Sequence, residues 1–172
     1  RYKKPIGIYW LQSAALKLTA ADPQQDIWAY RLVSVAGALI SVLIIAALTA
    51  FMFGGLSGLV AGLLSAAMFV LAFEARIAKT DAMLLASCTA AQASMARIYL
   101  SARGSEKTGL AWLVFWLALG AGILIKGPIA PLLALTTATT LCIADRSAAW
   151  AKGLRPLPGV LVMAAVVAPW LI

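Results

Sequence analysis

Long runs of apolar residues alternate with short polar segments along most of this chain. A membrane-spanning helix needs about 20 mostly apolar residues, and most of the runs approach that length. No strand-like alternation of period two passes through them, so we expect α-helices. The six runs are Leu32–Phe53, Gly55–Phe73, Ala82–Leu100, Gly109–Ile125, Ile129–Ile143 and Gly159–Ile172. The pattern therefore predicts an all-α integral membrane protein, with about six spans over residues 32–172.

Two of these runs depart from a full-length span. Ile129–Ile143 has only 15 residues, which predicts a tilted or broken helix. Gly159–Ile172 ends with the chain, and the chain begins at Arg1 rather than at a methionine. We therefore expect an internal piece of a longer protein whose last span is truncated.

Three glycines recur every four residues around the start of the second run: Gly54, Gly58 and Gly62. Small residues at this spacing let two helix backbones approach closely. We therefore expect this stripe to serve helix packing rather than chemistry.

Residues 1–31 differ from the rest because aromatic and basic side chains dominate their pattern. The aromatic residues are Tyr2, Tyr9, Trp10, Trp28 and Tyr30. This composition is typical of a helix that lies in the membrane interface. The sequence therefore predicts two segments, an interfacial one over residues 1–31 and a transmembrane core over residues 32–172.

The composition agrees with a membrane protein and excludes a disordered, collagen-like, coiled-coil or disulfide-rich chain. The chain is 63% hydrophobic and 12% charged, whereas a soluble domain is about 45–50% apolar and about 25% charged. Cys88 and Cys142 both lie in apolar runs and are expected to be packing residues. Because the chain has no histidine, this segment cannot supply a histidine-based zinc site or a histidine general base.

The net charge of +8 raises the question of an anionic partner. The basic residues are scattered between apolar runs and form no stripe, so nucleic acid is excluded as a partner. Phosphate groups of membrane lipids are the class of partner that fits.

If each run crosses the membrane once, three polar clusters share one face. They are the N-terminal segment, Glu74–Asp81 and Lys126-Gly127-Pro128, whereas Ser101–Thr108 and Ala144–Pro158 fall on the other face. The first face carries eight basic residues and the second carries six. This difference is too small for the positive-inside rule to decide which face is cytoplasmic.

Lys4-Pro5 opens the first cluster. Proline suits the first turn of a helix, so we expect Lys4 at a helix start, where free backbone N–H groups bind anions such as phosphate. The alternative is a plain interfacial anchor, in which lysine and aromatic side chains only hold the helix at the head groups.

Glu74–Asp81 contains four charged residues between two apolar runs. If a helix continued through this segment, Arg76, Lys79 and Thr80 would share one anion-binding face, with Glu74 and Asp81 on the opposite face. The alternative is a solvated loop with internal ion pairs.

Lys126 is a single cation between two apolar runs, and the Gly127-Pro128 pair after it breaks the helix. Backbone groups beside a cation favour an anion site. The alternative is a lysine that extends its charge to the membrane surface.

These motifs resemble those of a known family. Lys4-Pro5-x-x-x-Tyr9-Trp10-Leu11 is similar to the Lys-Pro-Pro-Leu-Tyr-Tyr-Trp-Leu stretch of the polyprenyl-phosphate-sugar glycosyltransferases, which are related to protein O-mannosyltransferases and lipid A aminoarabinose transferases. Ala75–Leu85 is similar to their Ala-Arg-x-Ala-Arg-Thr-Asp-x-Leu-Leu motif, and Ile125–Pro128 to their Thr-Lys-Gly-Pro. Pro169-Trp170 is similar to the start of one of their later spans.

The resemblance implies a GT-C fold, a many-helix membrane core with interfacial helices on the periplasmic side of a bacterial inner membrane. It also implies transfer of a sugar from a polyprenyl-phosphate donor to a hydroxyl acceptor, with inversion. The acceptor would be a glycolipid such as lipid A, or a protein. The face that carries the N-terminal segment would then be periplasmic.

The resemblance also assigns roles to residues. It implies that Lys4 contacts the donor phosphate and that Arg76, Lys79 and Lys126 belong to the same cavity. Further expected cavity residues are Tyr9 and Thr80 within the motifs and Glu74 directly before the second one. We expect Asp81 to orient Arg76 or Lys79 in support of catalysis. The catalytic carboxylate of the family precedes the Lys-Pro motif, so we expect it upstream of Arg1.

The chain departs from the family pattern at three positions. Lys3 stands where many relatives have glutamate, Ile6 replaces the second proline, and Lys79 replaces an arginine and so loses a bidentate fork. The metal contact implied for that glutamate is not transferred here. We assign no cofactor to this chain, and a divalent metal in the full-length protein stays open.

Two other classes of function fit broken helices and charges within a membrane. A secondary transporter or lipid-phosphate flippase uses both features. A scaffold subunit without catalytic activity is the other alternative.

Overall fold

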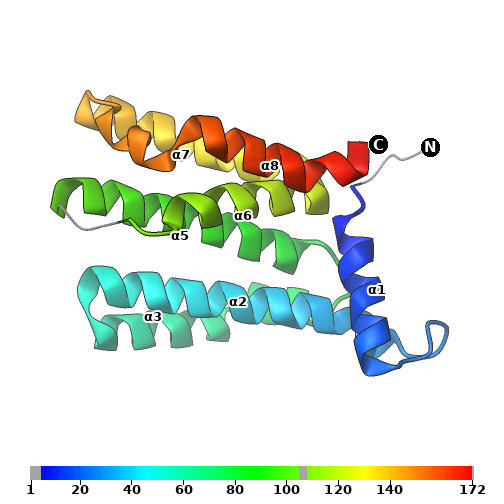
Figure 1. The fold of residues 1–172 in the computed structure, drawn as a ribbon. Helices are drawn as coiled ribbons and strands as arrows, with labels where there is room; N and C mark the ends of the chain where they lie inside the picture. Colours follow the sequence, from blue (N-terminus) through cyan, green and yellow to red (C-terminus); the bar gives the residue numbers. More distant parts are fainter. Residues whose placement is uncertain (1–4, 105–107, 172) are drawn as a thin grey trace. The chain divides into compact units, whose positions relative to one another are not determined.

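The structure is a computed structural model that describes residues 5–104 and 108–171 (Figure 1). Every regular element in this part of the chain is a helix, which confirms the predicted all-α fold. The elements are α1 (Gly7–Thr19), α2 (Ile27–Phe53), α3 (Gly55–Ala67), α4 (Phe69–Ala75), α5 (Asp81–Gly104), α6 (Ala111–Lys126), α7 (Ile129–Asp145), the 3-10 helix η1 (Ala149–Leu154) and α8 (Pro156–Leu171).

The helices form two compact units. Ile6–Thr89 make up the N-terminal unit, and the described residues from Ala90 onward, together with Pro5, make up the C-terminal unit. Helix α5 begins in the first unit and ends in the second.

Helix α2 is the centre of the N-terminal unit. It runs side by side with α3 and also contacts α1 and α4 (Figure 1). A Cβ atom added to Gly58 would lie 2.5 Å from the Cβ of Ala50, and one added to Gly62 would lie 3.0 Å from the Cβ of Ala46. The packing role predicted for the glycine stripe is therefore confirmed for these two residues. It is wrong for Gly54, which forms the turn before α3 with a φ of 94° and open space around it.

The second predicted span is bent rather than straight. Helices α3 and α4 meet at an angle of 62°. Met68, between them, has an extended backbone with a ψ of 120°, which interrupts the helical hydrogen bonds. Neither glycine nor proline stands at the bend, so no residue type marks it in the sequence.

By length and composition, α2 is long and apolar enough to cross a membrane, and the bent pair α3–α4 passes the same test if it counts as one span. Helices α6, α7 and α8 are apolar but shorter, with 16, 17 and 16 residues. Helix α2 starts five residues before the predicted Leu32, because Trp28, Tyr30 and Arg31 extend the helix although they end the apolar run.

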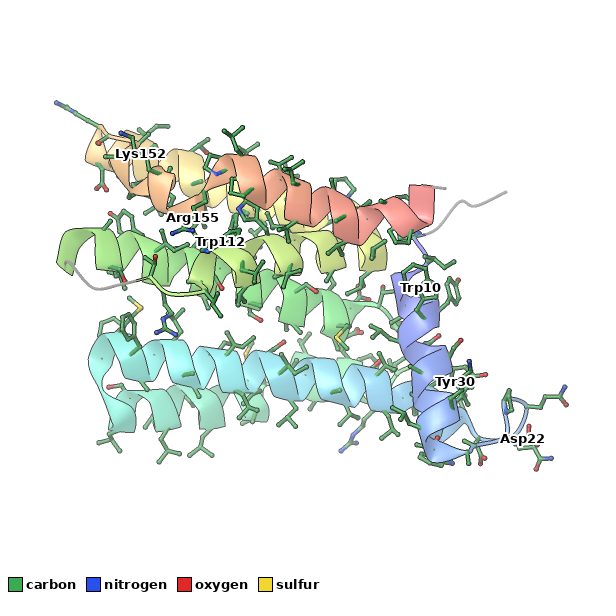
Figure 2. The ribbon with its side chains drawn as sticks, in the orientation of Figure 1. Trp10, Asp22, Tyr30, Trp112, Lys152 and Arg155 are labelled. Atoms are coloured by element: carbon green, nitrogen blue, oxygen red, sulfur yellow. The ribbon has the colours of Figure 1, made fainter. Side chains whose placement is uncertain are left out.

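A short loop joins α1 to α2. Helix α1 begins at Gly7, two residues after Pro5, and ends at Thr19, after which Ala20 adopts the left-handed conformation. The backbone N–H of Asp22 donates to the Asp26 carboxylate at 2.8 Å, and the Tyr30 hydroxyl donates to the Pro23 carbonyl at 3.1 Å (Figure 2). These bonds close the loop on itself and fix the start of α2.

In the C-terminal unit, α6 packs against both α7 and α8. The Trp116 indole N–H donates to the Leu154 carbonyl at 2.7 Å, just before α8 begins. A Cβ on Gly159 would overlap the Trp116 ring. Helix α8 begins at Pro156, and proline suits the first turn of a helix. It packs against Trp116 at Gly159, where no side chain is in the way.

Candidate functional site

The segment that carries the second polar cluster is not helical. Helix α4 ends at Ala75, α5 begins at Asp81, and Arg76–Thr80 form a linker of turns and bends. The Lys79 backbone N–H donates to the Ile77 carbonyl at 2.8 Å, which closes a tight turn. The expectation that a continuous helix would place Arg76, Lys79 and Thr80 on one face is therefore wrong. The linker instead exposes the Arg76 and Lys79 side chains.

Thr80 and Asp81 form the start of α5. The Leu84 backbone N–H donates to the Thr80 carbonyl at 2.9 Å, so Thr80 occupies the cap position before the helix. Asp81 lies in the first turn, where the helix dipole stabilises a negative charge. This pair therefore has a local structural role, and it fixes how the linker joins α5.

The backbone of the linker is held by α2. The Ser34 hydroxyl, itself buried, donates to the Lys79 carbonyl at 3.2 Å. One turn further along α2, a Cβ on Gly37 would lie 2.7 Å from backbone atoms of both Ala82 and Met83. The Lys79 side chain is thus free to face a ligand while its backbone is fixed. Sequence reasoning missed Ser34 and Gly37, because small residues in an apolar helix look like ordinary packing residues.

Glu74 is more buried than its cationic neighbours Arg76 and Lys79. It lies in the last turn of α4 and is partly buried. Its Oε2 atom is buried and accepts no hydrogen bond from any residue that the structure describes. A buried carboxylate oxygen without a donor is unfavourable by about 1–3 kcal/mol or more, so this atom suits a donor supplied from outside the described chain.

The third cluster lies in the C-terminal unit. Lys126 is the last residue of α6 and is exposed. Gly127 follows with a φ of 77° and a ψ of −150°, and its N–H donates to the Ile123 carbonyl at 2.9 Å. Pro128 then caps α7. The predicted helix break is therefore confirmed, and it leaves a lysine at the junction of two helices.

The structure brings some of the predicted residues together and not others. One short segment of the N-terminal unit gathers Glu74, Arg76, Lys79, Thr80 and Asp81. Tyr9 is an exposed residue on α1 in the same unit, whereas Lys126 belongs to the C-terminal unit.

Two points raised by the sequence concern Lys4 and a metal ion. Lys4 lies outside the described residues. Among the residues that are described, no group of three or more histidine, cysteine or acidic side chains is arranged to hold a metal ion.

Comparisons with known proteins place this arrangement in a family. The crystal structure of ArnT from Cupriavidus metallidurans in the apo state is similar to this chain with a TM-score of 0.85 at 20% sequence identity. The match covers 99% of this chain and 31% of that protein, so the chain spans less than a third of its length. This likeness confirms the expected GT-C-type membrane fold.

A search of curated proteins finds no match to this chain. The family described as dolichyl-phosphate-mannose-protein mannosyltransferase, however, matches residues 3–172. The predicted resemblance to membrane glycosyltransferases is therefore confirmed: this chain belongs to the dolichyl-phosphate-mannose-protein mannosyltransferase family.

Proposed function

We propose that the protein transfers a sugar from a polyprenyl-phosphate donor to a hydroxyl acceptor, with inversion at the sugar carbon. The acceptor is a glycolipid of the lipid A type or a protein. Residues 1–31 lie at the periplasmic interface of a bacterial inner membrane, and residues 32–172 form part of the membrane core. Membership of the family carries this proposal, and it favours sugar transfer over transport or a scaffold role.

The leaving group of this reaction is a lipid phosphate, whose negative charge grows in the transition state. Fixed cations in a site with little water stabilise such a charge more than water does. Arg76 and Lys79 fit this role because both side chains are exposed while Ser34 holds the linker backbone beneath them. Arg76 offers a planar fork to phosphate oxygens, and Lys79 offers a compact charge.

Lys126 and Lys4 complete the proposed phosphate site. Lys126 stands at the end of α6, where the helix dipole favours a cation, beside the Gly127 turn. Lys4 contacts the same phosphate from the segment before α1. Tyr9 on α1 contributes to the wall of the cavity.

Acid–base chemistry is divided between residues inside and outside this chain. The acceptor hydroxyl needs a carboxylate as general base, which we place upstream of Arg1. Asp81, fixed in the first turn of α5, is a positioning residue that supports the cations of the linker. Thr80 caps the same helix, and Glu74 offers its buried Oε2 atom to a donor on a substrate.

The test is an assay of the purified protein in detergent, with polyprenyl-phosphate sugars and candidate acceptors. We expect Arg76→Ala and Lys79→Ala each to lower the transfer rate by about 10²-fold or more, the range for losing a charge-stabilising group. Arg31→Ala and Lys17→Ala are the matched controls, since both remove an exposed cation of the same N-terminal unit.

Transfer at the wild-type rate in both linker variants would overturn the site. Loss of transfer in the Arg31 and Lys17 variants as well would show that general charge, and not this linker, matters. Thermal unfolding of each variant separates a lost site from a lost fold.

A further inference from the structure

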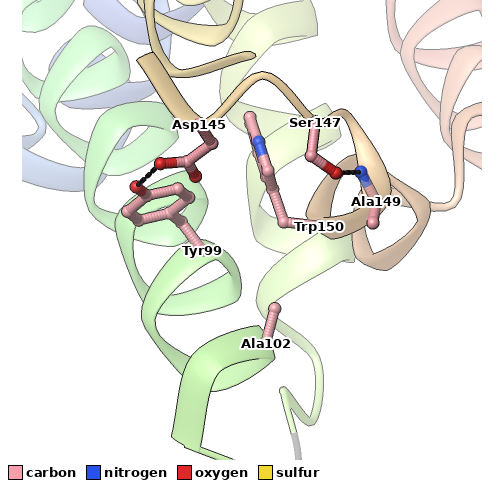
Figure 3. A pocket seen from close by; sticks show the side chains of 6 residues that line it. All are labelled: Tyr99, Ala102, Asp145, Ser147, Ala149 and Trp150. Atoms are coloured by element: carbon pink, nitrogen blue, oxygen red, sulfur yellow. Dashed lines mark hydrogen bonds between the residues drawn. The ribbon is translucent and has the colours of Figure 1, made fainter.

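A pocket of about 280 Å³ lies at the end of α7 that is remote from Lys126. It is lined by Tyr99, Ala102, Asp145, Ser147, Ala149 and Trp150, all in the C-terminal unit (Figure 3). Helix α7 has 17 residues, so about 25 Å of helix separates the pocket from Lys126. The pocket is thus distinct from the proposed phosphate site.

The pocket has a built polar wall. The Tyr99 hydroxyl donates to Asp145 Oδ1 at 3.1 Å, and the Tyr99 ring meets the Trp150 ring edge to face with 5.5 Å between centroids. On the other side of the indole, Ser147 Oγ accepts a hydrogen bond from the Ala149 backbone N–H at 3.3 Å (Figure 3). The aromatic contact and the hydrogen bonds fix the positions of these groups.

Trp150 carries the observation that points to a ligand. Its side chain is only 7% exposed, and its Nε1 atom is buried with no hydrogen-bond partner in the part of the chain that the structure describes. An indole N–H can only donate, and buried donors in native proteins are nearly always paired. A ligand with an acceptor oxygen would satisfy this donor.

The surroundings of the pocket are basic. Arg146 and Lys152 are exposed in the same segment. Arg155 already lies over the Trp112 ring, 5.4 Å from its centroid. Cations beside aromatic residues at the end of an apolar helix are typical of a membrane interface, where they attract anionic lipids.

We propose that this pocket binds the hydroxyl-bearing head group of an anionic phospholipid, such as the glycerol of phosphatidylglycerol. A hydroxyl group both accepts and donates, so its oxygen can accept from Trp150 Nε1 while its proton is donated to the Asp145 carboxylate. Arg146 and Lys152 attract the lipid phosphate. An ammonium head group does not fit, because it cannot accept the indole proton.

The test measures binding of lipid to the purified protein by native mass spectrometry, a readout that does not depend on sugar transfer. We expect phosphatidylglycerol to bind about tenfold more weakly to the Trp150→Phe variant than to wild type, the effect of one hydrogen bond. Trp28→Phe is the matched control, since it removes an exposed indole N–H that donates to Asp26 at 3.1 Å. Phosphatidylethanolamine should bind weakly and equally to all three proteins.

A second variant keeps the polar groups of the pocket intact. Ala102 is exposed and lines the pocket on α5, so Ala102→Leu fills the space without removing a hydrogen bond. We expect this variant to lose phosphatidylglycerol as well.

Three results would overturn the proposal. One is equal affinity of wild type and both pocket variants for phosphatidylglycerol. Another is an equal loss of phosphatidylethanolamine binding, which would mean that the indole binds a group common to both lipids. The third is tighter binding of soluble glycerol phosphate than of the lipid, which would identify a soluble ligand instead.

Discussion

Gly37 shows how a residue without a side chain beyond hydrogen can position the candidate site, because it lets two backbones approach closely. Ser34 and Gly37 lie one turn apart on α2 and both meet the chain around the start of α5, one by a hydrogen bond and the other by close approach. Neither residue touches a substrate in the function proposed above. Their contribution is to fix the backbone from which Lys79 extends.

We predict that Gly37→Ala destabilises the protein by about 1–3 kcal/mol, the usual effect of overpacking. The added methyl group would lie 2.7 Å from backbone atoms of Ala82 and Met83, which cannot rotate away as a side chain could. Thermal unfolding in detergent measures this, and transfer activity should fall as the linker shifts. Gly55→Ala is the control, because nothing lies within 4 Å of the added atom. Equal melting temperatures for the two variants would contradict the prediction.

At the scale of elements, apolar runs located the helices but not every interruption. The predicted run Ala82–Leu100 corresponds to α5, and the break at Gly127-Pro128 was visible because glycine and proline mark it. The bend at Met68 was not visible, since an ordinary apolar residue adopts it. In the candidate site, family motifs located Arg76, Lys79 and Asp81, but the linker geometry depends on contacts with α2 that lie 45 residues away in sequence.

The junction of α6 and α7 gives a prediction at this scale. Gly127 has a φ of 77° and a ψ of −150°, a backbone conformation that is unfavourable by about 1–3 kcal/mol for other residues. Gly127→Ala should therefore destabilise the junction by that amount. It should also change the direction in which the Lys126 side chain points. Hydrogen exchange of the amides near the junction reports the change. Pro128→Ala is the control, because its φ of −77° suits any residue. Equal exchange in both variants would refute the assignment.

At the scale of the whole molecule, two charged residues indicate how the C-terminal unit lies in a membrane. Lys126 ends α6 three residues before α7 begins, and Lys152 follows the far end of α7. A helix of about 25 Å is close to the thickness of the hydrocarbon core of a bilayer. The proposed phosphate site and the proposed lipid pocket would then face opposite sides of the membrane.

Labelling of single cysteines in intact cells tests this arrangement. Cys88 and Cys142 are first replaced by serine, and a cysteine is then introduced by Lys126→Cys or Lys152→Cys. We expect a membrane-impermeant maleimide to label the Lys126 variant from the periplasm, and the Lys152 variant only after the cells are opened. Labelling of both from the same side would contradict a span between them. Denatured protein, in which both cysteines react, provides the control.

The turn at Gly54 has a consequence for how the protein enters its membrane. No charged residue occurs between Arg31 and Glu74, and the turn between α2 and α3 consists of Gly54 alone. A single charge carried to the bilayer centre is unfavourable by about 2.5–3.5 kcal/mol on the insertion scale, and this turn carries none. In the topology proposed above, Arg31 and Glu74 flank this hairpin on the periplasmic side, so these charges, and not the turn at Gly54, are the ones that must cross the membrane during synthesis.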